Sequence, residues 1–176
     1  MDTGLTNKYV SRLCKKLIGK AFIGTFACDK LMKILPNVLS TRNLYKSISI
    51  IINILPRQYR FGHFIGLNVD WEKESFIVFD SLNLRFKDEN IEKFILSLKK
   101  EVKNLKGYEE SVQLQSFSSN YCGFYSVAFV LSRDERSKES MESFLSRFNL
   151  AKPSLENDKI AVEYITSFIR LHGIVK

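Results

Sequence analysis

The sequence predicts a protein of the α+β class, in which helices flank a small, mostly antiparallel central sheet. Two β-type runs, FGHFIGLNVD (61–70) and ESFIVFDSL (74–82), are separated by a short charged segment and are expected to form a hairpin. The segment DENIEKFILSLKKEVKNLK (88–106) has the apolar spacing of an amphipathic helix. The isoleucine-rich run SISIIINI (47–54) is typical of a buried strand.

Caps and breaks predict the elements before this core. A first helix is expected from Thr6, which can cap it, to Gly19, which can end it. The next segment, 20–37, has no clear periodicity, and Pro36 is expected to break it. The apolar face of the first helix consists of Val10, Leu13, Cys14 and Leu17.

The helix at 88–106 can be capped by Asp88 or Asn90. Beyond it, SVQLQSF (111–117) alternates as a strand does. The apolar stripe of the helix consists of Ile91, Phe94, Ile95, Leu98 and Val102.

The last part of the chain is predicted to be helical. The apolar run 121–131 forms a core helix, and two more helices are expected at about 137–148 and about 156–172, the second ended by Gly173. The length of 176 residues fits a single domain, 1–176.

Composition and charge argue against a secreted or membrane-spanning protein and indicate a polyanionic partner. The polar start predicts no secretion signal, and the longest apolar stretch, of about nine residues, is too short for a membrane span of about twenty. The net charge is +8, and the first 60 residues hold 11 Lys/Arg against 2 Asp/Glu. This asymmetry indicates a polyanionic partner, first of all nucleic acid, although a basic protein without such a role stays an alternative. The candidate DNA contacts are Lys8, Arg12, Lys15, Lys16 and Lys20.

The spacing of the three cysteines, Cys14, Cys28 and Cys122, matches no zinc motif, and two histidines provide few ligands for a metal site. We therefore expect reduced thiols and no metal.

One histidine and one aspartate are suited to thiol chemistry. A cysteine nucleophile needs a base, usually histidine, and a group that orients the base. His172 falls near a helix end, where a solvated histidine is common, whereas His63 falls early in an apolar strand. In a hairpin centred near residue 72, His63 faces about residue 81, which places Asp80 beside it. Taken singly, a structural histidine and a loop-capping aspartate stay open.

Cys122 stands in the stretch NYCGFY, at a predicted strand-to-helix junction. The first turn of a helix presents free N–H groups and a positive dipole end, which favour a thiolate and can bind an oxyanion. Gly123 is expected to leave room for the scissile carbonyl, and Gln115 can supply a side-chain N–H to the oxyanion. The alternative is a packed core cysteine.

The order His63, Asp80, Gln115, Cys122 resembles that of the adenovirus-type cysteine endopeptidases and their relatives, the Ulp1-like SUMO proteases. The stretches FDSLN and NYCGFY, and the seventeen-residue step from His63 to Asp80, are similar to the family pattern. The seven-residue step from Gln115 to Cys122 is closer to the adenoviral one. The similarity runs from about residue 22, at FIGTFACDK, to about residue 126.

The resemblance implies a papain-like or Ulp1-like protease fold with a circularly permuted order, the histidine preceding the cysteine. It implies Cys122 as nucleophile, His63 as general base and Asp80 as the carboxylate that orients the base. Gln115 and the Cys122 backbone N–H would form the oxyanion hole. The implied reaction is cleavage of viral capsid and core precursor proteins through an acyl-enzyme.

The resemblance also implies DNA and an activating peptide as cofactors, with no metal or organic cofactor. We expect a monomer, not bound to membranes, in the virion and the host nucleus or cytoplasm. No cysteine lies between residues 29 and 121 to tether such a peptide by a disulfide. Two other functions stay open: an isopeptidase that removes ubiquitin or a ubiquitin-like protein, and a basic virion protein that binds DNA without catalysis.

Overall fold

The computed structural model describes residues 5–54, 62–84, 88–110, 112–137 and 139–172. Five strands form one sheet whose spatial order is the chain order, β1-β2-β3-β4-β5. The strands are β1 (Phe22–Ala27), β2 (Ser47–Asn53), β3 (Phe64–Asp70), β4 (Ser75–Phe79) and β5 (Lys106–Glu110). The α-helices are α1 (Asn7–Ile18), α2 (Leu31–Ser40), α3 (Glu89–Glu101), α4 (Cys122–Ser132), α5 (Met141–Leu145) and α6 (Leu155–Leu171). Short 3₁₀ turns occupy Gly19–Ala21, Cys28–Lys30 and Thr41–Asn43.

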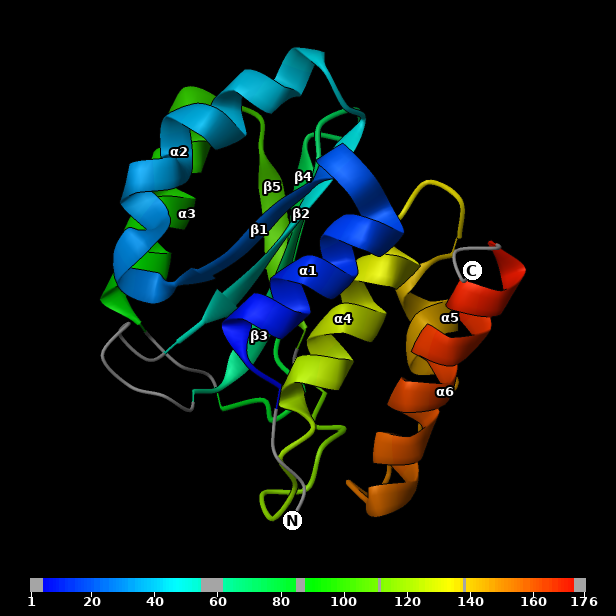
Figure 1. Ribbon diagram of the computed structural model, residues 1–176. Helices are drawn as coiled ribbons and strands as arrows, with labels where there is room; N and C mark the ends of the chain where they lie inside the picture. The colour runs from blue at the N-terminus through cyan, green and yellow to red at the C-terminus, as the bar shows by residue number, and fades with distance from the viewer. Residues whose placement is uncertain (1–4, 55–61, 85–87, 111, 138, 173–176) are drawn as a thin grey trace.

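The sheet separates two helical layers (Figure 1). Helices α2 and α3 cover one face, and α1, α4, α5 and α6 lie on the other. Alternate side chains of each strand supply the two cores: in β2, Ile50 and Ile52 pack with α2 and α3, while Ile51 packs with α4. Because both faces are covered, β2 and β3 are buried almost throughout.

The predicted α+β class is confirmed, but the sheet is mixed rather than mostly antiparallel. β2 pairs with β3, and β3 with β4, in antiparallel fashion, whereas the β1–β2 and β4–β5 pairs are parallel. The connections explain the difference. Helix α2 lies between β1 and β2, and α3 lies between β4 and β5, and such a crossover joins parallel neighbours.

Several predicted elements are confirmed together with their caps. The Thr6 side chain accepts a backbone hydrogen bond at the start of α1, and Gly19 ends the helix at φ 79°. Asp88 caps α3 by accepting two backbone N–H groups. The predicted hairpin is present as β3 and β4, with Gly66 opposite Phe79, one residue away from the predicted register.

Other segments differ from the prediction. Helix α2 runs through Pro36, because a proline removes one backbone hydrogen bond while Leu31 and Val38 still bury against the core. The helix predicted over 88–106 ends at Glu101, and the one predicted over about 137–148 is limited to the five residues of α5.

The strand predicted at 111–117 is wrong. Residues 112–117 form a loop, and the strand of this region is β5, which precedes it. β5 is an edge strand with mostly exposed side chains, so its sequence, KGYEE, lacks the apolar alternation of a half-buried strand. Ser111, Phe61 and Gly173, which also belong to predicted elements, lie outside the described residues.

Helix α4 is the central helix of its layer. Every residue from Tyr125 to Ser132 is buried, as expected of a helix that is apolar on all sides. Gly66 lets it approach β3 closely, since a Cβ there would lie 2.3 Å from Phe129 Cδ1. Phe129 stacks on Phe79 of β4 with ring centroids 4.9 Å apart. None of the helices within the described ranges is long and apolar enough to cross a lipid bilayer.

Candidate active site

Three residues singled out in the sequence come together at the ends of their elements. His63 immediately precedes β3, Asp80 immediately follows β4, and Cys122 is the first residue of α4. The antiparallel pairing of β3 with β4 brings the start of one beside the end of the other. Helix α4 packs on β3 and so delivers its first residue to the same corner of the sheet.

His63 is bonded to Asp80 in a largely buried pair. The imidazole Nε2 lies 2.5 Å from Asp80 Oδ1, and the two side chains are 11% and 15% exposed. The backbone holds the carboxylate in turn: the N–H of Leu82 donates to Oδ1 at 2.9 Å, and that of Leu84 donates to Oδ2 at 3.1 Å. A carboxylate fixed in this way can fix the plane and tautomer of the imidazole.

The charge state of the pair follows from its surroundings. Burial is the largest influence on the His63 pKa and lowers it, but hydrogen bonding and charge at Asp80 and Cys122 outweigh burial and raise the pKa from 6.5 to about 9. Burial would also raise the pKa of Asp80, yet His63 and the backbone amides hold it below its ordinary value. A protonated imidazole beside an ionised carboxylate is therefore the stable form at neutral pH.

Cys122 meets the other side of the imidazole. Asp80 occupies Nε2, and Nδ1 is buried with no hydrogen-bond partner in the described ranges. The interaction of Cys122 with this imidazole raises the His63 pKa, so Nδ1 is the nitrogen that remains for the thiol. The Cys122 Sγ also lies 4.0 Å from the carbonyl oxygen of Gly62.

The start of α4 presents backbone donors next to the thiol. The N–H groups of Phe124 and Tyr125 donate to the Tyr121 carbonyl at 2.8 and 3.1 Å. The two preceding amides, of Cys122 and Gly123, have no acceptor within the part of the chain that the structure describes. Free N–H groups and the positive end of a helix dipole favour a thiolate and can bind an oxyanion.

Gln115 lies in the loop before α4 and is fully buried. Its Oε1 accepts from Ser81 Oγ at 2.8 Å, and its Nε2 donates to the Ser119 carbonyl at 2.7 Å. The Ser81 carbonyl accepts from the N–H groups of Leu114 and Gln115, both at 2.9 Å. A side-chain amide has two N–H donors, and the bond to Ser119 uses one of them. Ser81, which sequence reasoning missed, thus ties Gln115 to the strand end that carries Asp80.

Two glycines have roles that the sequence did not indicate. Gly123 leaves no open space, because a Cβ there would lie 3.0 Å from Leu5 Cβ. The N-terminal segment, rather than a scissile carbonyl, fills this space. Gly62 makes the closer approach: its Cβ would lie 1.8 Å from Asn53 Oδ1, at the end of β2. Such a contact leaves no signal in a single sequence, since Asn53 and Gly62 belong to different segments.

The chain resembles solved structures in its fold. No family model and no curated protein sequence matches it. The ASFV protease aligns with a TM-score of 0.66 at 12% identity over 91% of this chain and 66% of its own. The Chlamydia abortus effector protein ChlaDUB aligns with a TM-score of 0.66 at 11% identity, over 96% and 93%. The yeast Ulp1 protease domain in complex with Smt3 aligns with a TM-score of 0.53 at 13% identity, over 98% of this chain and 79% of its own.

The chain has the Ulp1-like cysteine protease fold. At these identities the likeness concerns the fold alone, and the chemistry rests on the residues at the corner of β3, β4 and α4.

The five candidate DNA contacts lie on α1 and the turn that follows it, in the same helical layer as α4. Lys8, Arg12, Lys15 and Lys16 are exposed on α1, at spacings of three and four that place them on one face, and Lys20 follows in the next turn. Helix α1 contains no acidic residue. None of the five forms an ion pair with a residue inside the described ranges.

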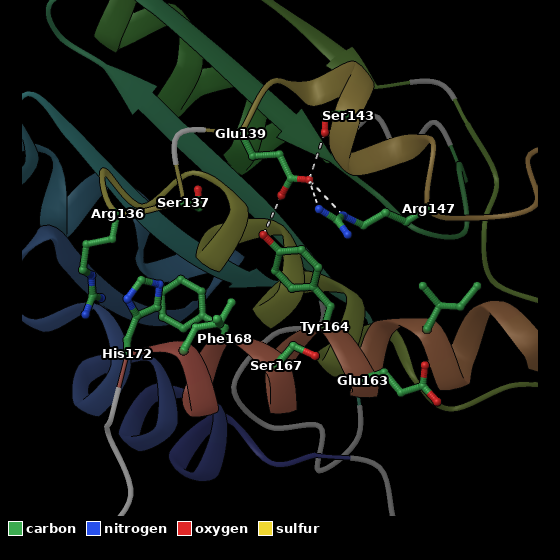
Figure 2. Close-up of a pocket in the computed structure, with 12 residues that line it drawn as sticks. Arg136, Ser137, Glu139, Ser143, Arg147, Glu163, Tyr164, Ser167, Phe168 and His172 are labelled. Atoms are coloured by element: carbon green, nitrogen blue, oxygen red, sulfur yellow. Dashed lines mark hydrogen bonds and ion pairs between the residues drawn. The ribbon is translucent and has the colours of Figure 1, made fainter.

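A separate cavity of about 630 Å³ lies between α5, α6 and the segment before α5 (Figure 2). Its central carboxylate is already paired: Glu139 accepts from Tyr164 at 2.6 Å, from Ser143 at 3.2 Å and from Arg147 at 2.9 Å. None of His63, Asp80, Gln115 and Cys122 lines this cavity. Within the described ranges, no group of three His, Cys, Asp or Glu side chains could hold a metal ion.

Proposed function

We propose that the chain is a cysteine protease in which Cys122 is the nucleophile, His63 the general base and Asp80 the residue that orients the base. The observation that carries this proposal is one buried imidazole, bonded through Nε2 to Asp80 at 2.5 Å and interacting with Cys122 at a helix start. A histidine with only a structural role needs no thiol at its second nitrogen. The fold likeness supports the same function.

The geometry suggests how the reaction proceeds. In the reactive pair, His63 Nδ1 already holds the proton given up by the Cys122 thiol, and the thiolate adds to the scissile carbonyl carbon. The free backbone amide of Cys122 and the second N–H of Gln115 would stabilise the resulting oxyanion. The imidazolium then gives its proton to the leaving amine as the C–N bond breaks, which leaves an acyl-enzyme. His63 then takes a proton from water, and the hydroxide adds to the acyl carbon. The C–S bond breaks, which releases the acid and restores the thiolate beside the protonated His63.

For the substrate, we propose viral capsid and core precursor proteins, cut by endopeptidase action during virion maturation. The adenoviral Gln115-to-Cys122 step and the fold likeness to a viral protease support this choice. A second candidate is removal of a ubiquitin-like protein. The fold likeness to Ulp1, which is solved with Smt3, favours it.

The exposed basic face of α1 supports DNA as a cofactor of the proposed protease. Affinity for a labelled duplex should fall steeply between about 50 and about 200 mM salt, and Lys15→Glu with Lys16→Glu should weaken it further, as measured by fluorescence anisotropy. Salt-independent binding would remove DNA from the proposal and leave the protease intact. We also propose a non-covalent activating peptide, a monomeric state, and a location in the virion and host nucleus or cytoplasm.

Thiol labelling tests the catalytic assignment. Iodoacetamide at neutral pH should modify Cys122 faster than Cys14 and Cys28, because Cys122 is partly exposed and the other two are buried. His63→Ala should slow the modification, and Cys122→Ser should abolish it. Labelling of Cys14 or Cys28 as fast as Cys122 would show that the assignment is wrong.

Cleavage assays then separate the two substrate classes. Mass spectrometry of a peptide library, with and without DNA, should reveal endopeptidase sites. Cleavage of ubiquitin-type fluorogenic substrates, with none of precursor peptides, would favour the isopeptidase candidate instead.

A further inference from the structure

The segment 112–121, here called the Gln115 loop, connects β5 to α4 without belonging to the sheet. Its inner side is held by Ser81, whose carbonyl and hydroxyl bond to Gln115 and whose carbonyl also accepts from Leu114. A loop held on one side only can still rotate about that attachment. A contact on the other side of the loop therefore contributes to where the Gln115 amide points.

Asn157, in the first turn of α6, holds that other side. Its Nδ2 donates to the Leu114 carbonyl at 3.0 Å, directly before Gln115. The same Nδ2 donates to the Asn149 carbonyl at 3.0 Å, while Oδ1 accepts from the Asn149 N–H at 2.8 Å. Asn157 is fully buried, and these bonds use both of its donors.

Within the described ranges, the other donor near the Leu114 carbonyl is engaged elsewhere. The Tyr125 hydroxyl lies 3.5 Å from the Leu114 carbonyl, but it lies closer, at 3.0 Å, to Asp158 Oδ1. A hydroxyl has a single proton to donate, and the carboxylate is the stronger acceptor. Leu114 is fully buried, so its carbonyl depends on Asn157 for its hydrogen bond.

We propose that Asn157 is a positioning residue for catalysis, which aims the free N–H of Gln115 at the oxyanion by fixing the Leu114 carbonyl. The proposal rests on the proposed protease function. It assigns to α6, which contributes none of the proposed catalytic residues, an indirect effect on the transition state through the Gln115 loop.

The substitution Asn157→Asp tests the role with little change of shape. The aspartate keeps an oxygen that can accept from the Asn149 N–H, but it places a second oxygen against the carbonyls of Asn149 and Leu114. The Leu114 bond is then replaced by repulsion, and the loop is released from α6.

The matched control is Tyr164→Phe. Tyr164 also lies on α6 and donates a hydrogen bond from a partly buried position, to Glu139 at 2.6 Å (Figure 2). It faces the cavity between α5 and α6 and not the Gln115 loop. A loss that arises only from a weaker α6 should occur in both variants.

Kinetics give the first readout. Loss of an oxyanion donor costs about 10² to 10³ in kcat, so its misplacement by Asn157→Asp should lower kcat by about tenfold to a hundredfold with little change in KM. Because Asn157 acts through Gln115, the same substitution should cost less than about twofold in a Gln115→Ala background. Equal losses in both backgrounds, or a change confined to KM, would overturn the proposal.

A second readout needs no substrate. Exchange of the Gln115 side-chain amide, observed by NMR, is slowed by its bond to Ser119. Asn157→Asp should speed this exchange by about tenfold, and Tyr164→Phe should not. Unchanged exchange in Asn157→Asp would overturn the proposal even in a chain that cleaves nothing. Fast exchange in that same inactive chain would show that Asn157 fixes the Gln115 loop although the proposed function fails.

Discussion

Gly62→Ala should damage the His63–Cys122 pair without touching either side chain. The added Cβ would lie 1.8 Å from Asn53 Oδ1 and 2.6 Å from its Cγ, at least about 1 Å short of ordinary van der Waals contact. Asn53 is buried in β2, and its Nδ2 donates to Asn7 Oδ1 at 3.0 Å. Either Asn53 leaves this position, or the backbone at Gly62 and His63 moves away from β2.

Both responses have a measurable size. Displacing Asn53 amounts to overpacking a filled site, which costs about 1–3 kcal/mol of unfolding free energy. Moving the backbone shifts His63 by about 1 Å, and a misplacement of that size costs about 10²-fold in rate. We therefore expect a lower melting temperature, together with a loss of kcat/KM and of the Cys122 alkylation rate.

Gly107→Ala provides the control for this experiment. A Cβ at Gly107 would lie 2.4 Å from the Phe76 carbonyl oxygen, at the β5 edge of the sheet. It should lower stability by a similar amount and leave the alkylation rate of Cys122 unchanged. Wild-type stability and wild-type alkylation in Gly62→Ala would refute the argument, because the close approach to Asn53 would then impose no constraint.

Three further predictions concern charge and packing. In the proposed mechanism the imidazolium protonates the leaving amine, so kcat/KM should fall as pH rises through about 9, the pKa of His63. A decline centred near pH 6.5 would contradict this. The raised pKa means that His63 stabilises the fold fully below pH 6.5 and loses this contribution as pH rises through about 9. The unfolding free energies of wild type and Asp80→Asn, from urea titrations, should therefore differ more at pH 6 than at pH 10. Gly66→Ala should lower the unfolding free energy by about 1–3 kcal/mol in the same titration, because its Cβ would lie 2.3 Å from Phe129. An unchanged urea midpoint would show that α4 can move away from β3.

Local patterns predicted the parts of the fold that local chemistry determines. Thr6 and Asp88 cap helices as expected, because a side-chain acceptor before an apolar stripe satisfies the free amides of the first turn. The hairpin predicted the approach of His63 to Asp80, since antiparallel strands joined by a short turn have one close pairing. A shift of one residue in the register did not matter, because Asp80 lies beyond the last paired residue, Phe79.

The prediction failed where long-range packing decides. The strand β5 has mostly exposed side chains, so no apolar alternation marked it, and Leu114 and Gln115 are buried by contacts with Ser81 and α6 rather than by a sheet. The bond from Asn157 to Leu114 joins residues 43 positions apart. Its partners become visible only in three dimensions.

Ser81 has a consequence for how the site tolerates thermal motion. It follows Asp80 directly and bonds to Gln115 through both its carbonyl and its hydroxyl. When the end of β4 moves, the Asp80 carboxylate and the Gln115 amide move with it. The distance between these two groups therefore changes less than the position of either. The alignment of the Asp80 carboxylate with the Gln115 amide can thus persist when the end of β4 is displaced.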